Sequence, residues 1–283
     1  LAAGALLGDA FIHLIPEALE ESSPALASTL IIVGILAFFI LFNVAIAETE
    51  IIQNFNADIA IQKDGSLLIT ENIIYNFGSN HKHGIFRDIP LTAENGPWLN
   101  INVTGAKNEI GRPYRYATSI TNNVLRIKVG DPNLLVTGIK TYIISYQVYG
   151  AIRTFSDHDE LYWNVTGDNW PVIIQSANTL VTLPDSAITN TKIDCFTGQR
   201  GSTQKNCVFS QNGTSTSYRT TQALNINEGL TIVFGIPLGY IQNYYVPPQQ
   251  TNTITDKSSS YSAFQWFPFF VFFVIFISVI TKS

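Results

Sequence analysis

The sequence has little charge, and its few cations are unevenly placed. Lysine, arginine, aspartate and glutamate make up 13% of the 283 residues, about half the share of an ordinary globular protein. No lysine or arginine precedes Lys63, and no run of basic residues follows it. A nucleic-acid surface needs clustered cations that displace counterions from phosphates. We therefore expect no nucleic-acid partner, whereas low charge suits a chain that lies partly in membrane lipid.

Cysteine is also scarce, because Cys195 and Cys207 are the only two in the sequence. No second cysteine pair and no nearby histidine completes a tetrahedral zinc set, so we expect no structural metal and no cofactor. If this part of the chain is exported, a local disulfide is expected, because compartments outside the cytoplasm are oxidising. The alternative is two unpaired buried thiols.

Two long apolar runs of the chain carry no charge. At about 1.5 Å per residue, a helix over 30–47 nearly spans a bilayer core of about 30 Å. The same run ends in Ala45-Ile46-Ala47 before Glu48, the small-x-small pattern of a signal-peptide cleavage site. It therefore predicts either a transmembrane helix or a signal peptide, with the following residues outside the cytoplasm. The second run, 263–280, predicts a C-terminal transmembrane helix with Lys282 on the inner side.

Residues 1–29 precede the first run and contain a polar stripe. Asp9, His13 and Glu17 are four residues apart, so on a helix they share one face. They are candidate metal ligands, because ionisable groups in a membrane helix usually face a partner or a site. The alternative is an amphipathic end that lies at the membrane interface.

One segment of this N-terminal region resembles a helix of the ZIP family of metal transporters, namely Gly4-Ala-Leu-Leu-Gly8-Asp9-Ala-Phe-Ile-His13-Leu-Ile-Pro16-Glu17-Ala18. The likeness covers only residues 1–25. The motifs that build the transport site in that family do not follow, so we expect a ZIP-like fragment and not a working transporter.

Between the apolar runs the hydrophobic pattern has a period of two, which is typical of strands. Alternating segments at 55–62 and 66–77 flank Lys63-Asp64-Gly65, a strong hairpin signal. Further strands are expected at 98–105, 112–119, 123–129, 138–149, 160–166, 173–183, 192–197, 206–210, 215–222 and 228–236. The sequence predicts a mainly β fold over 48–246, an immunoglobulin-like antiparallel β-sandwich of roughly nine or ten strands. The polar stretch 247–262 is expected to be a linker to the last run.

Two polar segments of the β region contain candidate ligand-binding residues. These candidates are His81, His83, Arg87, Asp157, His158, Trp163 and Trp170. If the two segments meet, their histidines and carboxylates would suit a metal or acid–base site. The alternative is two solvated loops, since the spacing matches no known metal pattern.

Arg87 is expected to pair with Asp88 or to clamp a turn carboxylate. The two tryptophans either fill the core or form a shelf for a ligand. No nucleophile elbow, phosphate loop or paired-carboxylate signature appears, so we expect no enzyme.

The β region as a whole closely resembles the bacterial predicted-membrane-protein family called domain of unknown function 2207. The resemblance lies in Lys63-Asp64-Gly65-Ser66-Leu67, Thr70-Glu71, His81-Lys-His83-Gly-Ile-Phe-Arg87-Asp-Ile-Pro90, Gly130-Asp-Pro132, Gly138-Ile-Lys-Thr-Tyr142, Asp157-His-Asp-Glu-Leu-Tyr-Trp-Asn-Val-Thr-Gly-Asp-Asn-Trp-Pro171, Cys195 with Cys207, and Gly235-Ile-Pro-Leu-Gly-Tyr240. It implies a signal peptide, an extracytoplasmic β domain and later membrane spans, and it supplies no activity.

These observations together predict a cell-membrane protein whose β domain is extracytoplasmic. We expect it to bind an unknown protein or envelope partner, or to support an envelope complex. The alternative is a membrane protein related to zinc transport through its ZIP-like fragment.

Overall fold

The fold is taken from a computed structural model of the chain. It describes residues 49–92, 98–184 and 192–242, together with 23, 29, 32–34 and 36. The chain divides into Leu1–Pro247 and Pro248–Ser283, and all described residues belong to the first unit. Among them, no helix has the length and apolar character that crossing a membrane requires.

Several predictions fall outside these ranges. The candidate ligands Asp9, His13 and Glu17, most of the apolar run 30–47, the linker 247–262 and the whole run 263–280 lie outside the described residues.

The described residues are almost entirely strands and turns, which confirms the mainly β prediction. The strands are β1 (Ile51–Ile61), β2 (Leu67–Asn76), β3 (Gly84–Pro90), β4 (Asn100–Lys107), β5 (Tyr116–Thr121), β6 (Val124–Gly130), β7 (Ile139–Tyr149), β8 (Ile152–Thr154), β9 (His158–Asn164), β10 (Ile173–Ile174), β11 (Ala177–Thr182), β12 (Ile193–Gly198), β13 (Cys207–Asn212), β14 (Ser215–Thr220) and β15 (Gly229–Pro237).

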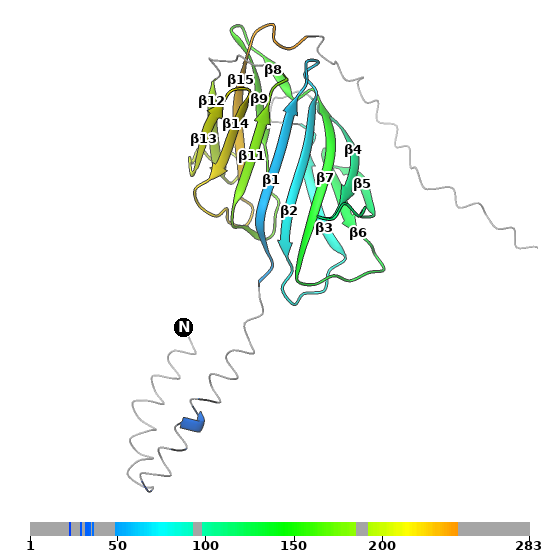
Figure 1. The fold of residues 1–283 in the computed structure, drawn as a ribbon, viewed down its shortest axis with the longest axis vertical. Coiled ribbons are helices and arrows are strands. Elements are labelled where there is room, and N and C mark those ends of the chain that lie inside the picture. Colours follow the sequence, from blue (N-terminus) through cyan, green and yellow to red (C-terminus); the bar gives the residue numbers. More distant parts are fainter. Residues whose placement is uncertain are drawn as a thin grey trace, which may run out of the picture. The chain divides into compact units, whose positions relative to one another are not determined.

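The strands form three sheets (Figure 1). The large sheet has the order β13-β14-β11-β1-β2-β7-β4, with β10 beside β1. The four-stranded sheet is β12-β15-β9-β8, and the three-stranded sheet is β3-β6-β5. Each period-two run expected from the sequence overlaps a strand, but two strands were not expected. β8 is only three residues long, and β3 was interpreted as a loop because a charged pair interrupts its apolar residues.

The prediction of a wholly antiparallel sandwich is wrong in the middle of the large sheet. β1 pairs in parallel with both β10 and β11, with Phe55 opposite Ala177. A short hairpin forces its two strands to be antiparallel, but a long crossover does not. The chain between β1 and β10 passes through all three sheets before it returns to the large sheet. Its length therefore allowed β1 to pair with β10 and β11 in either a parallel or an antiparallel direction.

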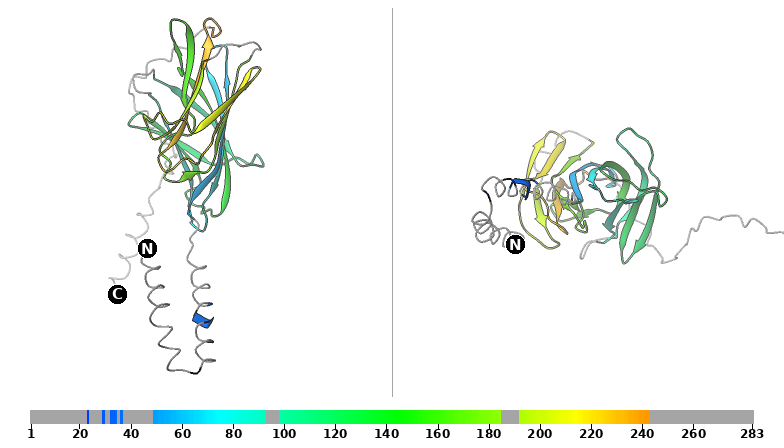
Figure 2. Two further views of the ribbon diagram at one scale, coloured as in Figure 1. Left: turned by 90° about the vertical axis from the view of Figure 1, so that its left-hand side faces the viewer. Right: turned by 90° about the horizontal axis from the view of Figure 1, so that it is seen from below.

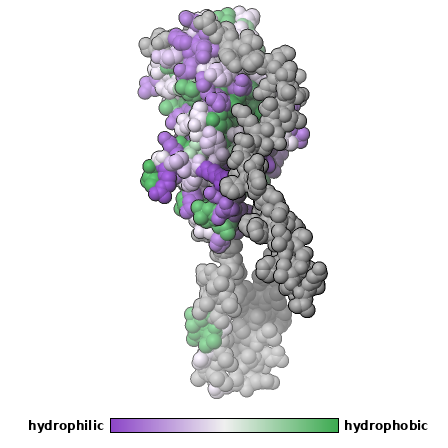
Figure 3. All heavy atoms as spheres, turned by 90° about the vertical axis from the view of Figure 1, so that its right-hand side faces the viewer, coloured by the Kyte–Doolittle hydropathy of each residue, from purple (hydrophilic) through white to green (hydrophobic). Residues whose placement is uncertain are grey.

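Both smaller sheets pack on the same face of the large sheet (Figure 2). Glu71, Ala57, Thr179 and Tyr218 are successive partners across four strands of the large sheet, so their side chains share one face. On that face, Tyr218 donates a hydrogen bond to the Val233 carbonyl of the four-stranded sheet, at 3.0 Å. The buried core includes residues of all three sheets, and the coloured residues on the face in Figure 3 are mainly hydrophilic with scattered hydrophobic ones.

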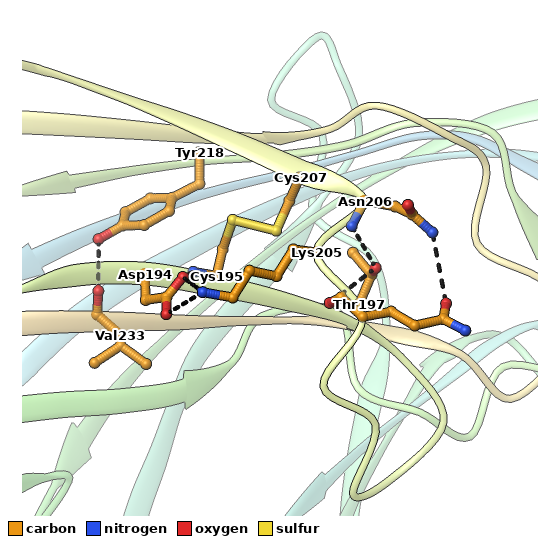
Figure 4. Close-up of a disulfide and its surroundings, with 9 residues drawn as sticks. Asp194, Cys195, Thr197, Lys205, Asn206, Cys207, Tyr218 and Val233 are labelled. Atoms are coloured by element: carbon orange, nitrogen blue, oxygen red, sulfur yellow. Dashed lines mark hydrogen bonds and ion pairs between the residues drawn. A yellow bond between two sulfur atoms is a disulfide. The ribbon is translucent and has the colours of Figure 1, made fainter.

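Cys195 and Cys207 form the predicted disulfide, with their Cα atoms 6.2 Å apart. It joins β12, at one edge of the four-stranded sheet, to β13, at one edge of the large sheet (Figure 4). Lys205 and Asp194 form an ion pair beside it at 2.7 Å. The disulfide thus closes this side of the fold by linking two sheets that share no backbone ladder there.

Candidate functional site

A buried ion pair lies between the large sheet and the three-stranded sheet. Arg87 of β3 and Glu71 of β2 have side chains that are 1% and 0% exposed. Arg87 Nε donates to Glu71 Oε2 at 2.8 Å, and Arg87 Nη2 donates to Glu71 Oε1 at 2.7 Å. The Tyr146 hydroxyl of β7 donates to the same Oε1 at 2.5 Å. Two parallel N–H···O bonds of this kind fix both the distance and the orientation of the two groups.

Alternation along the two strands places these charges inside the domain. Leu67, Ile69, Ile73 and Tyr75 point inward from β2, and Glu71 occupies the inward position in their middle. Arg87 likewise lies between the inward residues Ile85 and Ile89 of β3. A buried charge is tolerated when it is paired and hydrogen-bonded. The sequence signal for this pair was therefore one charged residue at an inward position of each strand. This signal could be read only if β3 was recognised as a strand.

Of the two expectations for Arg87, the ion pair with Asp88 does not form, whereas a bidentate clamp on a carboxylate does, with Glu71 of strand β2 in place of a turn residue. Successive strand residues point to opposite faces, so Asp88 points outward while Arg87 points inward. Asp88 instead accepts two hydrogen bonds from Arg126 of β6, at 2.7 and 2.6 Å. Only the backbone carbonyl of Asp88 meets Arg87, as an acceptor from Nη1 at 2.8 Å.

The electrostatics of the cluster keep its donors protonated. Burial alone would lower the pKa of Arg87, but the adjacent Glu71 carboxylate raises the pKa above its ordinary value. Burial and then the Glu71 charge raise the pKa of Tyr146 well above its ordinary value. Arg87 therefore stays a cation and Tyr146 stays a hydrogen-bond donor across the physiological pH range.

The pair also positions residues 164–171, which we call the seam loop. Arg87 Nη2 donates to the Val165 carbonyl at 2.9 Å, and the Val165 amide donates to the Leu230 carbonyl of β15 at 2.8 Å. The loop thus bridges the two smaller sheets. Gly167 has a positive φ of +75°, and a Cβ there would lie 2.6 Å from Arg87 Nη1. Only glycine allows the loop to approach the guanidinium this closely.

One cleft of about 320 Å³ lies on the Trp170 side of the seam loop, and we call it the Trp170 cleft. The rings of Tyr75, Phe77 and Trp170 contribute to its lining, and Trp170 is held by a 2.8 Å hydrogen bond from Nε1 to the Thr166 carbonyl. Its charged lining residues are already paired. Lys82 meets Glu50 at 3.1 Å, Arg126 meets Asp88 at 2.6 Å, and Arg87 is held by Glu71.

A second cleft, of about 310 Å³, lies between β9 and the end of β3, and we call it the Trp163 cleft. Arg153 and Arg200 line it together with Asp168 and the exposed ring of Tyr162. Trp163 also lines it and is 5% exposed, yet its Nε1 has no hydrogen-bond partner among the described residues. A buried donor without a partner costs about 1–3 kcal/mol.

A third, wider hollow of about 620 Å³ adjoins the Trp163 cleft. The two share the lining residues Pro90, Thr92, Asp168, Gln199 and Arg200. Asparagine side chains contribute much of the rest of its described lining, at Asn122, Asn123, Asn169 and Asn227. The combined surface is rich in amide and guanidinium donors.

The histidine segments do not form the metal site that we considered. His81 and His83 are exposed, and His83 Nδ1 lies 3.1 Å from the Leu134 carbonyl oxygen. His158 lies instead at the start of β9, with its Nδ1 2.6 Å from Asp157 Oδ1. Within the described ranges, no group of three or more histidine, cysteine or acidic side chains could hold a metal ion.

Asp157 and its neighbours form a surface ion network. Hydrogen bonds from Lys192, at 2.9 Å, and from His158 lower the pKa of Asp157 to about 2. The His158 ring stacks on Phe155 with centroids 4.9 Å apart, and its Nε2 is 3.5 Å from Glu160 Oε2. These contacts account for the polar turn before β9. Of the candidate ligand residues, the structure brings together Arg87 and the loop that carries Trp170, with Trp163 in the neighbouring cleft.

Comparison with solved structures gives only distant likenesses. An M1 zinc metallopeptidase from Deinococcus radiodurans is 8% identical at a TM-score of 0.38, over 66% of this chain and 42% of that chain. Native yeast LTA4 hydrolase is 5% identical at a TM-score of 0.43, over 66% of this chain and 29% of that one. Likeness at this level carries no argument about function.

Comparison with curated proteins and families is more specific. Uncharacterized protein YciQ of Escherichia coli (strain K12) is 32% identical over 216 residues, which cover 72% of this chain and 32% of YciQ. The chain therefore spans about a third of the length of that relative. The match to the family model begins at residue 51, so the ZIP resemblance of residues 1–25 stays a prediction. That model, described as the N-terminal domain of predicted membrane proteins (DUF2207), matches residues 51–236, and the chain belongs to this family.

Proposed function

We propose that the β domain is displayed on the extracytoplasmic side of the membrane and works there as a binding module without chemistry of its own. Membership of a family of predicted membrane proteins supports the membrane location. The side of the membrane, the binding role and the absence of catalysis are parts of the proposal.

The disulfide supports the extracytoplasmic side. Disulfides persist in oxidising compartments and are rare where thiol reductants are abundant. Cys195 and Cys207 join the edges of two sheets, and both residues are buried in the core. A domain that relies on this link is suited to export.

The observation that carries the binding role is the Trp163 cleft. It combines two arginines, an exposed tyrosine ring and a buried indole N–H without a partner among the described residues. Ligand sites typically unite an apolar wall with a few directed polar groups in this way. Arg153 lies 5.8 Å from the Tyr162 ring centre, which holds a cation beside an aromatic face. The donor-rich lining suits a ligand that presents acceptor oxygens, such as a carboxylate.

The described residues that line the clefts include no histidine and no cysteine. Histidine bases and cysteine nucleophiles are therefore absent from these described linings, and the carboxylates Glu50 and Asp88 of the Trp170 cleft are already engaged in ion pairs. This favours binding over catalysis.

Display is tested by adding protease to intact cells that produce the chain. We expect the β domain to be cleaved while a cytoplasmic marker protein stays intact. Full protection of the β domain, with cleavage only after the cells are lysed, would count against display.

Binding is tested by thermal shift of the full chain in detergent, with a panel of carboxylated, phosphorylated and neutral small molecules. We expect a carboxylated compound to raise the melting temperature, with the effect lost in Trp163→Phe and Arg200→Gln. The matched controls are Trp98→Phe and Arg112→Gln, whose positions lie outside the lining of the three clefts. A panel without a hit, or hits that the two cleft variants leave unchanged, would remove the binding role.

A further inference from the structure

The loop that connects β6 to β7 carries two adjacent exposed leucines. Leu134 is 61% exposed and the adjacent Leu135 is 52% exposed, and Ile139 at the start of β7 is 55% exposed. Single exposed apolar residues are ordinary, but contiguous ones at a loop tip mark a surface that meets something else. We call Leu134 and Leu135 the leucine tip.

Backbone hydrogen bonds hold this connection against the β2–β3 connection. The Lys82 amide donates to the Val136 carbonyl at 3.1 Å, and the Val136 amide donates back to the Lys82 carbonyl at 2.8 Å. The Gly138 amide donates to the Gly78 carbonyl at 2.9 Å. The leucine tip is therefore presented by a defined pair of loops.

These loops lie at the end of the large sheet where the chain enters the domain (Figure 1). Ile51, the first residue of β1, is paired with Asn76, and Asn76 is paired with Ile139 on its other side. Glu50 reaches the β2–β3 connection directly, through a 3.1 Å ion pair with Lys82. We call this end of the domain the entry end.

The sequence places the entry end close to lipid if the run 30–47 stays attached as a membrane helix. That run ends four residues before Ile51, and an extended chain advances at most about 3.5 Å per residue. The entry end then lies within about 14 Å of the end of the helix. β1 has 11 residues, so the opposite end, with the β1–β2 turn, is about 35 Å further away.

The charged side chains beside the leucine tip are paired with one another, so they leave no surplus charge of one sign there. His81, Lys82 and His83 are exposed on the β2–β3 connection, and Lys82 has a side chain that is 50% exposed. The nearest acidic groups have cationic partners, since Glu50 meets Lys82 and Asp131 meets Arg115 at 3.9 Å. Adjacent apolar side chains whose charged neighbours are already paired are suited to the interface of a bilayer, where burial of apolar surface drives binding.

We infer that the leucine tip is a membrane-docking surface, in which Leu134 and Leu135 enter the headgroup region and orient the domain on the bilayer. The occupant is the lipid surface to which the chain is anchored. The inference rests on the proposed membrane anchoring, and it commits residues 30–47 to the role of a retained helix.

The test uses the full chain in vesicles of about 70% phosphatidylcholine and 30% phosphatidylglycerol. Because both native cysteines are in the disulfide, a cysteine introduced by Leu134→Cys can be labelled alone with an environment-sensitive fluorophore. The matched control is Leu68→Cys, which is 47% exposed near the opposite end of β2. We expect lipid-borne quenchers to act roughly fivefold more strongly on the label at 134 than on the label at 68.

Equal quenching at the two positions, or stronger quenching at 68, would overturn the inference. A second labelled position, Asn133→Cys, is combined with Leu134→Glu and Leu135→Glu. These changes affect only exposed side chains, so the fold is retained while the quenching is expected to fall to the level seen at 68. Unchanged quenching in that variant would equally overturn the role of the leucines. Neither measurement depends on which side of the cell membrane the domain occupies, so a failure of extracytoplasmic display is a separate result.

Discussion

Arg87 Nη2 lies 2.7 Å from Glu71 Oε1, and each residue comes from a different sheet. Both side chains are almost fully buried, so solvent and salt screen their interaction little. Arg87 also donates to the Val165 carbonyl, so the same guanidinium fixes the seam loop between the two clefts. The pair therefore links the packing of the sheets to the geometry of the candidate site.

Removing one partner of this pair is expected to be strongly destabilising, because the other charge stays buried without compensation. Arg87→Met or Glu71→Leu alone should lower the free energy of unfolding by about 3–5 kcal/mol. The double variant should recover most of that loss, because it leaves neither charge in the core. Denaturant titration of the full chain in detergent, followed by tryptophan fluorescence, measures all three variants. If the loss of unfolding free energy in the double variant equals the sum of the losses in the two single variants, the two charges are not coupled.

Gly167→Ala should disturb the seam loop by two separable effects. Gly167 and Gly201 both have positive φ, at +75° and +84°, so alanine strains the backbone at each position by about 1–2 kcal/mol. A Cβ at Gly201 meets nothing within 4 Å, whereas a Cβ at Gly167 meets Arg87 Nη1. Gly167→Ala should therefore cost a further 1–3 kcal/mol, about the cost of overpacking. Melting temperatures of the two variants give the comparison, and equal losses would rule out the close contact with Arg87.

Reducing the disulfide is expected to lower stability without abolishing the sheets. Cys195 and Cys207 are 12 residues apart in sequence, and a link across a loop of this length contributes about 3 kcal/mol by restricting the unfolded chain. Thermal unfolding with and without a reducing agent measures the effect. The double variant Cys195→Ser and Cys207→Ser is the control and should not respond to the reducing agent. If the reducing agent leaves the melting temperature of the native chain equally unchanged, the disulfide does not form.

Stability is expected to fall as the pH drops from about 4 to about 2. Lys192 and His158 lower the pKa of Asp157 from 3.8 to about 2. A carboxyl whose pKa is depressed in the folded state stabilises the fold above its unfolded value, and this stabilisation is lost as the pH falls through the folded value. Glu50 also contributes stability that is lost on acidification. Burial alone would raise the pKa of Glu50, but hydrogen bonds from Tyr75 and Lys82 outweigh burial and lower the pKa below its ordinary value.

Melting temperatures of the native chain and of Asp157→Asn, recorded across this pH interval, measure the contribution of Asp157. The variant should lose less stability on acidification than the native chain. Parallel curves would mean that Asp157 has no depressed pKa in the folded state. Asp131→Asn serves as a control at another acidic surface position.

Alternation of apolar residues was sufficient to predict the strands that contain few charges, because the period reports directly which side chains face the core. β2 and β7 lie where this pattern placed them. The same rule failed at β3, where Arg87 occupies an inward position and looked like part of a loop. An inward charge is explained only by its partner, and Glu71 is 16 residues away on another sheet.

The parallel pairing of β1 and the two clefts could not be predicted for a related reason. Phe55 and Ala177 meet only because the chain between them crosses all three sheets. The Trp163 cleft likewise combines the end of β3, strand β9 and the residues after β12. Local sequence patterns define each element, but they do not say which elements become neighbours. The disulfide was predictable because its two cysteines left no other pairing.

We propose that the β domain folds outside the cytoplasm, and the redox state of Cys195 and Cys207 in living cells gives the sharpest test of this. Cells are quenched with acid, free thiols are alkylated, and the peptides are analysed by mass spectrometry. We expect both cysteines to be protected from alkylation in the full chain and to become modified in a variant that lacks residues 1–47. Two free thiols in the full chain would contradict it.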